Sequence, residues 1–230
     1  MTAIRSEAEI KQDIENELYW DSRVEAAGID VDVKNARATL RGEVGSYRER
    51  AAARSAARRI PGVVDVNDEL TIRYLSTPPL PTDTELETRI RDILSWEPTI
   101  DSSSMTVTVA GGVITLEGTV DAHWKKAYAE SRVSGLRGVM GVENKLAVVP
   151  TGDLADELVA EDIVGALDRD SLVNADCVTV AVNGGIARLS GEVPSWVSRD
   201  AAEEDASYTA GVVDVQNDLQ IATPQPGMAR

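Results

Sequence analysis

LRGEV at positions 40–44 returns as LEGTV at 116–120 and as LSGEV at 189–193. Every copy also has a Gly-Val pair twenty positions after the motif glycine, at 62–63, 138–139 and 211–212. The chain therefore contains the same unit three times, and the copies are about 75 residues apart.

The length of this unit determines the predicted architecture. Solenoid repeats have units of roughly 20–50 residues, whereas a longer unit is expected to fold around its own core. Hydrophobic residues make up 43% of the chain and Phe is absent, so these cores must be aliphatic. The sequence predicts three tandem domains, at residues 1–76, 77–150 and 151–230.

Apolar residues at helical spacing open each copy, which predicts a first helix. They are Ile10, Ile14 and Leu18, then Leu86, Ile90, Ile93 and Leu94, then Leu158, Ile163 and Leu167. Thr82 and Glu85 have the spacing of a capping box at a helix start. Two strands are expected next, because the pairs 111–112 and 184–185 are Gly-Gly and favour a tight hairpin.

An Ala-rich second helix and a last strand complete each unit. The helix is expected at about 47–60, 123–136 and 196–208. A hairpin followed by a helical crossover produces a mixed sheet whose last strand is parallel to its neighbour. The predicted fold class is α+β: three α-β-β-α-β sandwiches, each a three-stranded mixed sheet with two helices on one face. The motif glycine is expected to let a helix pack closely on the sheet.

Charge and composition exclude several classes of function. The net charge is −16, and residues 151–230 contain 15 acidic but only 4 basic residues, which argues against nucleic-acid binding. The chain has one cysteine and one histidine, so a disulfide, a thiolate metal cage and a Ser-His pair are not expected. Cys177 is expected to be a small buried strand residue. Nucleotide-binding and hydrolase motifs are absent from the sequence, which predicts a protein that is not an enzyme.

The combined pattern resembles the BON domain, named for bacterial osmotically induced and nodulation proteins. The resemblance rests on the order of helix, hairpin, Leu-x-Gly-x-Val, Ala-rich helix and Gly-Val-x-x-Val in all three copies. It implies an α/β sandwich without enzymatic activity, found in envelope or osmotic-stress proteins and proposed to bind phospholipid surfaces. Family members often carry an export signal, and the start of this sequence has none, so a cytoplasmic location is expected.

Candidate binding residues lie at the start and along one side of the second helices. Aromatic rings beside lysines suit a membrane interface, and basic residues spaced by four suit anionic lipid. The lipid or partner candidates are Tyr47, Arg50, Arg54, Arg58, Trp124, Lys125, Lys126 and Trp196. The alternative interpretations are a hydrophobic staple for the rings and a solvated face for the arginines.

Two further patterns lead to separate hypotheses. Trp20 and Trp96 occupy equivalent places near the end of the first helix, and contacts between adjacent domains are the preferred interpretation, with edge packing as the alternative. Asp68, Asn144 and Asn217 are polar at an inward position of the last strand. They are expected to hydrogen-bond nearby loop backbone, with an ion site made with neighbouring carbonyls as the alternative.

The leading hypothesis is a non-catalytic binding module for a membrane phospholipid surface or a protein partner under osmotic or envelope stress. One alternative is a cytosolic potassium-binding sensor, in which potassium would be the single cofactor. The other is a structural module that forms homo-oligomers through the opposed charges of the first and last copies. No other metal and no nucleic-acid partner is expected.

Overall fold

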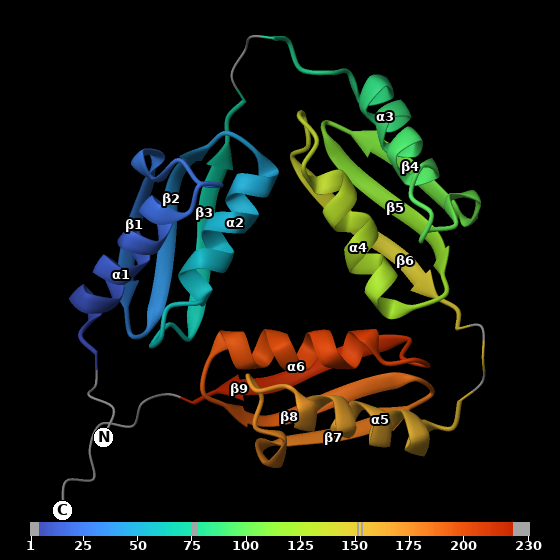
Figure 1. Ribbon diagram of the computed structural model, residues 1–230. Coiled ribbons are helices and arrows are strands. Elements are labelled where there is room, and N and C mark those ends of the chain that lie inside the picture. Colours follow the sequence, from blue (N-terminus) through green and yellow to red (C-terminus); the bar gives the residue numbers. More distant parts are fainter. Residues whose placement is uncertain (1–4, 75–77, 151, 153, 223–230) are drawn as a thin grey trace, which may run out of the picture.

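The computed structural model describes residues 5–74, 78–150, 152 and 154–222, which form three α+β domains (Figure 1). Domain 1 contains α1 (Glu7–Trp20), β1 (Ile29–Lys34), β2 (Arg37–Val44), α2 (Tyr47–Arg58) and β3 (Asp65–Ile72). Domain 2 contains α3 (Asp83–Ser95), β4 (Met105–Ala110), β5 (Val113–Val120), α4 (His123–Ser134) and β6 (Gly141–Val148). Domain 3 contains α5 (Asp156–Arg169), β7 (Val178–Asn183), β8 (Ile186–Val193), α6 (Trp196–Tyr208) and β9 (Asp214–Ile221). The predicted fold class is confirmed.

Each domain has the same sheet with the same register. The first two strands are antiparallel and the third pairs in parallel with the second, which is therefore central. Gly42 lies opposite Ile29 on one side and Leu70 on the other, and the other two motif glycines have equivalent partners. A single 3₁₀ turn precedes the first strand of every domain.

Aliphatic side chains fill the core between each sheet and its two helices. In domain 1, Ile14, Leu40, Ala56 and Leu70 are at most 2% exposed. Burial of one such Leu or Ile side chain contributes roughly 1.5–3 kcal/mol, so a core of this kind can hold a domain of this size together. The capping box predicted at Thr82 is confirmed, because its side chain accepts from the backbone N–H of Glu85 and the Glu85 carboxylate accepts in return.

The motif glycines are required by the backbone rather than by helix packing. Gly42, Gly118 and Gly191 have φ of 127°, 121° and 136°, in the region that other residues rarely adopt. A Cβ on Gly42 would lie 2.0 Å from the carbonyl oxygen of Gly28, just before the first strand. The expectation that a helix approaches this glycine is therefore wrong, since the close neighbour is the adjoining backbone.

Cys177 also differs from expectation. The residue ends the 3₁₀ turn before β7 and is exposed, because the strand begins one residue later. Its Sγ accepts a hydrogen bond from the side chain of Asn174 at 3.2 Å.

The polar position of the last strand bonds to the second helix. Asn144 donates to the carbonyl oxygen of Lys126 at 2.7 Å, and Asn217 donates to that of Arg199 at 3.2 Å. Asp68 cannot donate in this way and instead pairs with the Arg50 guanidinium at 3.0 Å. A nearby backbone partner is present at all three positions, because each side chain also accepts from the backbone N–H two residues later. These partners lie in the strand and the helix rather than in a loop.

The three domains form a triangle with an approximate threefold arrangement (Figure 1). Helices α2, α4 and α6 face the centre, whereas α1, α3 and α5 lie toward the outside. All helices lie on the near side of the sheets in this view, so the three open sheet faces share the far side. Those faces carry ion pairs between neighbouring strands, such as Arg41 with Glu69 and Arg188 with Asp218, both at 2.7 Å.

Candidate functional site

The first residues of the second helices mediate the contacts between domains. Tyr47, His123 and Trp196 begin α2, α4 and α6, and each follows its motif glycine by five positions. Because the fold repeats, the three side chains leave their domains in equivalent directions. Each one lies against the next domain around the triangle.

Trp196 joins domain 3 to domain 1. Its indole Nε1 donates a hydrogen bond to the carbonyl oxygen of Val64, 3.2 Å away. The guanidinium of Arg58 lies 4.5 Å from the centroid of the indole, and that of Arg199 lies 5.1 Å from it. Such cation–π contacts are worth roughly 0.5–2 kcal/mol each, more when water is excluded. Burial lowers the pKa of Arg58, and the charge of the nearby Arg54 adds to this effect.

His123 joins domain 2 to domain 3. Its Nε2 lies 3.5 Å from a carboxylate oxygen of Asp214, at the start of β9. Burial holds the pKa of His123 below its usual range, and the Lys126 charge acts in the same direction, whereas Asp214 opposes it. The adjacent Trp124 stacks on Tyr208 at the end of α6, with ring centroids 5.9 Å apart.

Tyr47 and Tyr74 join domain 1 to domain 2. Tyr47 packs against the hydrophobic core of domain 2. The hydroxyl of Tyr74 donates to the carbonyl oxygen of Val139 at 2.7 Å, and burial raises the pKa of this phenol. Domain 1 thus contacts domain 2 through the start of its second helix, as domains 2 and 3 contact their neighbours.

These three contacts are heterologous, since the start of one second helix meets the far end of the next domain. A heterologous contact produces a closed ring when the rotation between units is one third of a turn. Domains 1 and 3 are not adjacent in sequence, so the contact of Trp196 with Val64 closes the ring.

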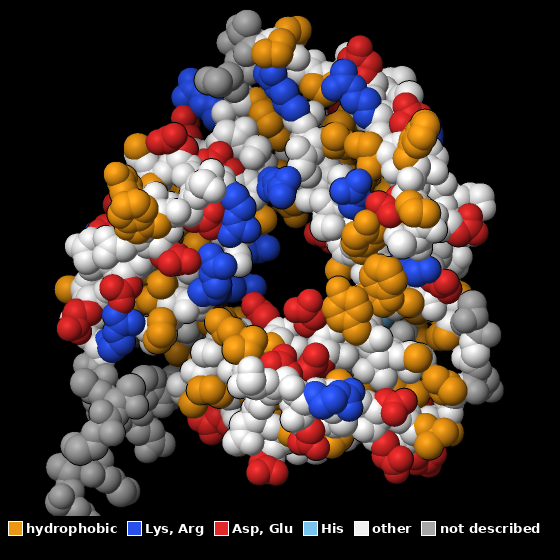
Figure 2. All heavy atoms as spheres, in the orientation of Figure 1, with side chains coloured by type: hydrophobic (Ala, Val, Ile, Leu, Met, Phe, Trp, Pro, Cys, Tyr) orange, Lys and Arg blue, Asp and Glu red, His pale blue; other side chains and the backbone are white. Residues whose placement is uncertain are grey.

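A pocket of about 540 Å³ lies between α4 and α6 at the border of the central opening, with Arg58 of α2 as its one residue from domain 1. Figure 2 shows basic side chains on the α2 side of the central opening, acidic ones on the α6 side and hydrophobic ones beside α4. The pocket is lined by Arg58, Trp124, Tyr128, Asp200, Glu204 and Tyr208, among others. Its size falls within the roughly 300–1,000 Å³ of small-molecule sites.

The structure separates the predicted lipid or partner residues into different environments. Arg50 pairs with Asp68, Arg54 is exposed on α2, and Arg58 lies on the indole of Trp196. The remaining candidates lie at contacts within the molecule, as described for Tyr47, Trp124 and Trp196.

The two predicted lysines lie on α4. Lys125 pairs with Asp121 at 2.7 Å and lies 5.7 Å from the centroid of Trp124, while the carbonyl of Lys126 accepts from Asn144. All eight candidates lie on the second helices, α2, α4 and α6, as the sequence predicted.

Trp20 and Trp96 lie on the surface rather than between domains. Trp20 is 80% exposed and contacts Tyr19 edge-on, and Trp96 is 86% exposed. The first helices lie toward the outside of the ring (Figure 1), so their ends do not reach the contacts between domains. The expected contact between domains through these two indoles is not what the described part of the chain shows.

Several residues of the ring and pocket were not among the sequence candidates. Tyr74, Tyr128 and Tyr208 all contribute rings to these contacts or to the pocket wall. The chain has 4 Trp, 5 Tyr and no Phe, and this scarcity of aromatic residues is the sequence signal that could have pointed to the three tyrosines. Asp200 and Asp214 carried no distinguishing signal.

The described residues contain no group of three or more His, Cys, Asp or Glu side chains arranged to hold a metal ion. None of the described helices combines the length and the apolar character needed to cross a bilayer. The site therefore consists of rings, arginines and carboxylates around a pocket.

Comparison with known proteins gives three kinds of match. The BON domain family matches residues 6–74, 82–150 and 155–223. Osmotically-inducible protein Y of Escherichia coli (strain K12) is 29% identical over 132 residues, which are 56% of this chain and 66% of that protein. This chain therefore matches slightly less than two thirds of that relative's length.

Two solved structures of CdsD, a structural protein of the type III secretion system of Chlamydia trachomatis, are also similar. They are 16% and 14% identical, cover 94% and 95% of this chain, and are themselves covered to 98% and 100%. Their TM-scores of 0.25 and 0.26 are too low to support any inference about this protein.

Proposed function

Because this chain belongs to the BON-domain family, with three copies along it, we propose that it is a non-catalytic osmotic-stress protein that binds phospholipid surfaces. The link to osmotic stress comes from its similarity to Osmotically-inducible protein Y.

The observation that carries the proposal is the exposure of two equivalent indoles. Trp20 ends α1 and Trp96 directly follows α3, and they are 80% and 86% exposed. Trp favours the interface between water and lipid, where the ring is buried at headgroup level. The equivalent residue of domain 3 is Arg169, whose charge can meet lipid phosphate.

Trp20, Trp96 and Arg169 occupy equivalent positions in the three domains. Residues related by a rotation axis lie at the same height along that axis. A surface that approaches along the axis and reaches one of these positions would therefore reach all three. Weak contacts on a rigid frame then add through effective concentration.

Charge decides which lipid suits this surface. A net charge of −16 repels strongly anionic membranes, so binding by the indoles is expected to favour zwitterionic lipid. The arginines of α2 do not support an anionic-lipid face, because Arg50 is paired with Asp68 and Arg58 lies on Trp196.

Co-sedimentation with phosphatidylcholine vesicles tests the proposal. We expect the Trp20→Ser/Trp96→Ser variant to bind at least about 10-fold more weakly, a change of ~1.4 kcal/mol. Ile186→Ser is a matched control, because it removes a 38% exposed apolar side chain from β8. Vesicle binding that is absent in the original protein, or equal in the double variant and the control, would contradict the proposal.

A further inference from the structure

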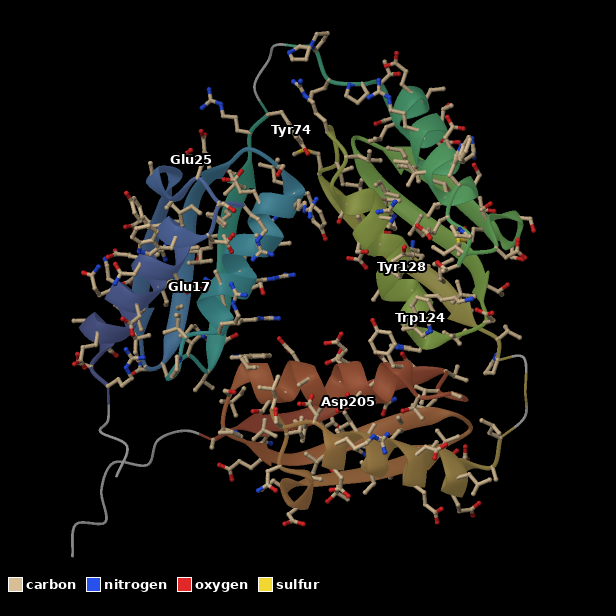
Figure 3. All side chains as sticks on the ribbon, in the orientation of Figure 1. Glu17, Glu25, Tyr74, Trp124, Tyr128 and Asp205 are labelled. Atoms are coloured by element: carbon tan, nitrogen blue, oxygen red, sulfur yellow. The ribbon has the colours of Figure 1, made fainter. Side chains whose placement is uncertain are left out.

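The pocket at the centre of the ring has an aromatic wall. Trp124 stacks on Tyr208 with centroids 5.9 Å apart and planes at 25°, and it meets Tyr128 edge-on at 5.8 Å. Trp124 and Tyr128 lie one helical turn apart on α4, at the part of the opening that faces α6 (Figure 3). The ring faces carry negative quadrupole charge, which attracts cations.

Two carboxylates lie beside these rings, and the charges of Arg58 and Arg199 act on one of them, Asp200. Asp200 and Glu204 are one turn apart on α6 and line the same pocket. Neither has an ion pair within 4.0 Å among the described residues. A cation in the pocket would therefore meet aromatic rings and two carboxylates that form no ion pair within 4.0 Å among the described residues.

The opposite wall contains an unsatisfied cation. Arg58 lies on α2, and its Nε is buried and has no hydrogen-bond partner among the described residues. Its guanidinium rests on the Trp196 indole rather than on a carboxylate. A buried donor without a partner is costly, so this arginine favours an added acceptor.

We propose that the central pocket binds a small zwitterion that carries a quaternary ammonium group. The aromatic rings with Asp200 and Glu204 hold the ammonium end. Arg58 donates to the carboxylate or phosphate end. Rings favour a large, weakly hydrated cation, and recognition of quaternary ammonium by aromatic cages follows from this preference. A free betaine and the choline headgroup of a lipid share this chemistry.

Other small ligands fit the pocket less well. A simple anion would face the carboxylates of Asp200 and Glu204, and a compact metal ion needs several oxygen ligands at close range. No group of three or more His, Cys, Asp or Glu side chains arranged to hold a metal ion occurs in the part of the chain that the structure describes. The separation of opposite charges on two walls matches a ligand that carries both.

Titration calorimetry with soluble probes tests the inference, with glycine betaine and phosphocholine as ligands and glycine as the comparison that lacks the methyl groups. We expect saturable binding of at least one methylated probe and at least 10-fold weaker binding of glycine. Binding of glycine betaine identifies the free zwitterion as ligand, and binding of phosphocholine alone identifies the headgroup. No binding of either probe at millimolar concentration, or equal binding of glycine, overturns the inference.

Two substitutions place the binding in this pocket. We expect Tyr208→Leu to weaken binding at least 10-fold and Glu204→Gln to weaken it several-fold, while Glu161→Gln on α5 leaves it unchanged. Circular dichroism confirms that each variant is folded. Unchanged affinity in the two pocket variants overturns the assignment. Because the probes are soluble, loss of vesicle binding through Trp20 and Trp96 would not affect this result.

Discussion

At the scale of single residues, the repeated glycine is explained by its own backbone. The repeated motif identifies this position in all three copies but does not identify its close neighbour. A glycine inside a strand can be required by a bulge, by a bend or by the close approach of another backbone. The deciding quantities are a positive φ and a carbonyl oxygen within about 2 Å of a would-be Cβ, and both depend on the path of the chain before the strand.

Gly191→Ala is expected to destabilise domain 3 by roughly 2–4 kcal/mol, because the new methyl group meets the carbonyl oxygen of Cys177 and the φ of 136° is strained. Gly184→Ala is the matched control. Gly184 also has a positive φ, of 58°, but has no atom within 4 Å of its would-be Cβ, so a loss of only about 1 kcal/mol is expected. Urea denaturation measures both, and equal losses would refute the role given to the close carbonyl.

His123 is the only histidine, so its imidazole can be followed without ambiguity in an NMR titration. Burial at the contact with domain 3 lowers its pKa, whereas the unfolded chain should titrate near 6.5. The folded protein thus binds this proton less readily than the unfolded chain. Stability is therefore expected to fall as the pH drops below about 6.5 toward the lower pKa of the folded protein.

The variant His123→Gln should lose less stability than the original protein over that pH range. Asp214→Asn should lower the pKa of His123 further, because the carboxylate that favours the imidazolium is gone. An imidazole that titrates at 6.5 or above in the folded protein would contradict the buried contact.

At the scale of elements, helices and strands were predictable and their partners were not. Apolar periodicity and Gly-Gly turns are local signals, so the order and type of the elements followed from the sequence. An aromatic residue at a helix start suits both a local staple and a contact with another domain. Trp196 bonds to Val64, which is 132 residues away, and no local pattern contains that information.

The second helix and the last strand are joined by two different side-chain contacts in this chain. Asn144 and Asn217 donate to a helix carbonyl, whereas Asp68 uses the side chain of Arg50. The helix position is Arg in both domain 1 and domain 3, so an arginine there accommodates either Asp or Asn in the strand.

Asn144→Asp is expected to destabilise domain 2 by about 1–3 kcal/mol at pH 7, because a carboxylate would face the Lys126 carbonyl and the nearby Glu130. Adding Lys126→Arg should recover part of this loss by recreating the Arg50 and Asp68 pair. Thermal melts of both variants test this. An Asn144→Asp protein as stable as the original would show that the amide donor is unimportant.

At the scale of the whole molecule, three similar contacts convert a tandem repeat into a ring. Two of them join domains that are already neighbours along the chain, and only the contact at Trp196 joins the first domain to the last. The basic side of α2 and the acidic side of α6 thus face the same opening within one molecule (Figure 2), where the sequence suggested contacts between molecules. The pocket and the equivalent placement of the exposed indoles both depend on this closure.

Distances between the three domains test the closed ring directly. Equivalent, exposed positions of β3, β6 and β9 are available at Asn67, Glu143 and Gln216. Spin labels are attached at pairs of these positions in a Cys177→Ser background, and pulsed electron paramagnetic resonance gives the three distances. Trp196→Ala in the 67–216 pair is the control, and it should broaden and lengthen that distance while the other two stay unchanged.

A ring with approximate threefold symmetry predicts three narrow distributions with nearly equal mean distances. A chain of independent or linearly stacked domains would give a 67–216 distance that is broad or close to the sum of the other two, and that result would contradict the closed ring.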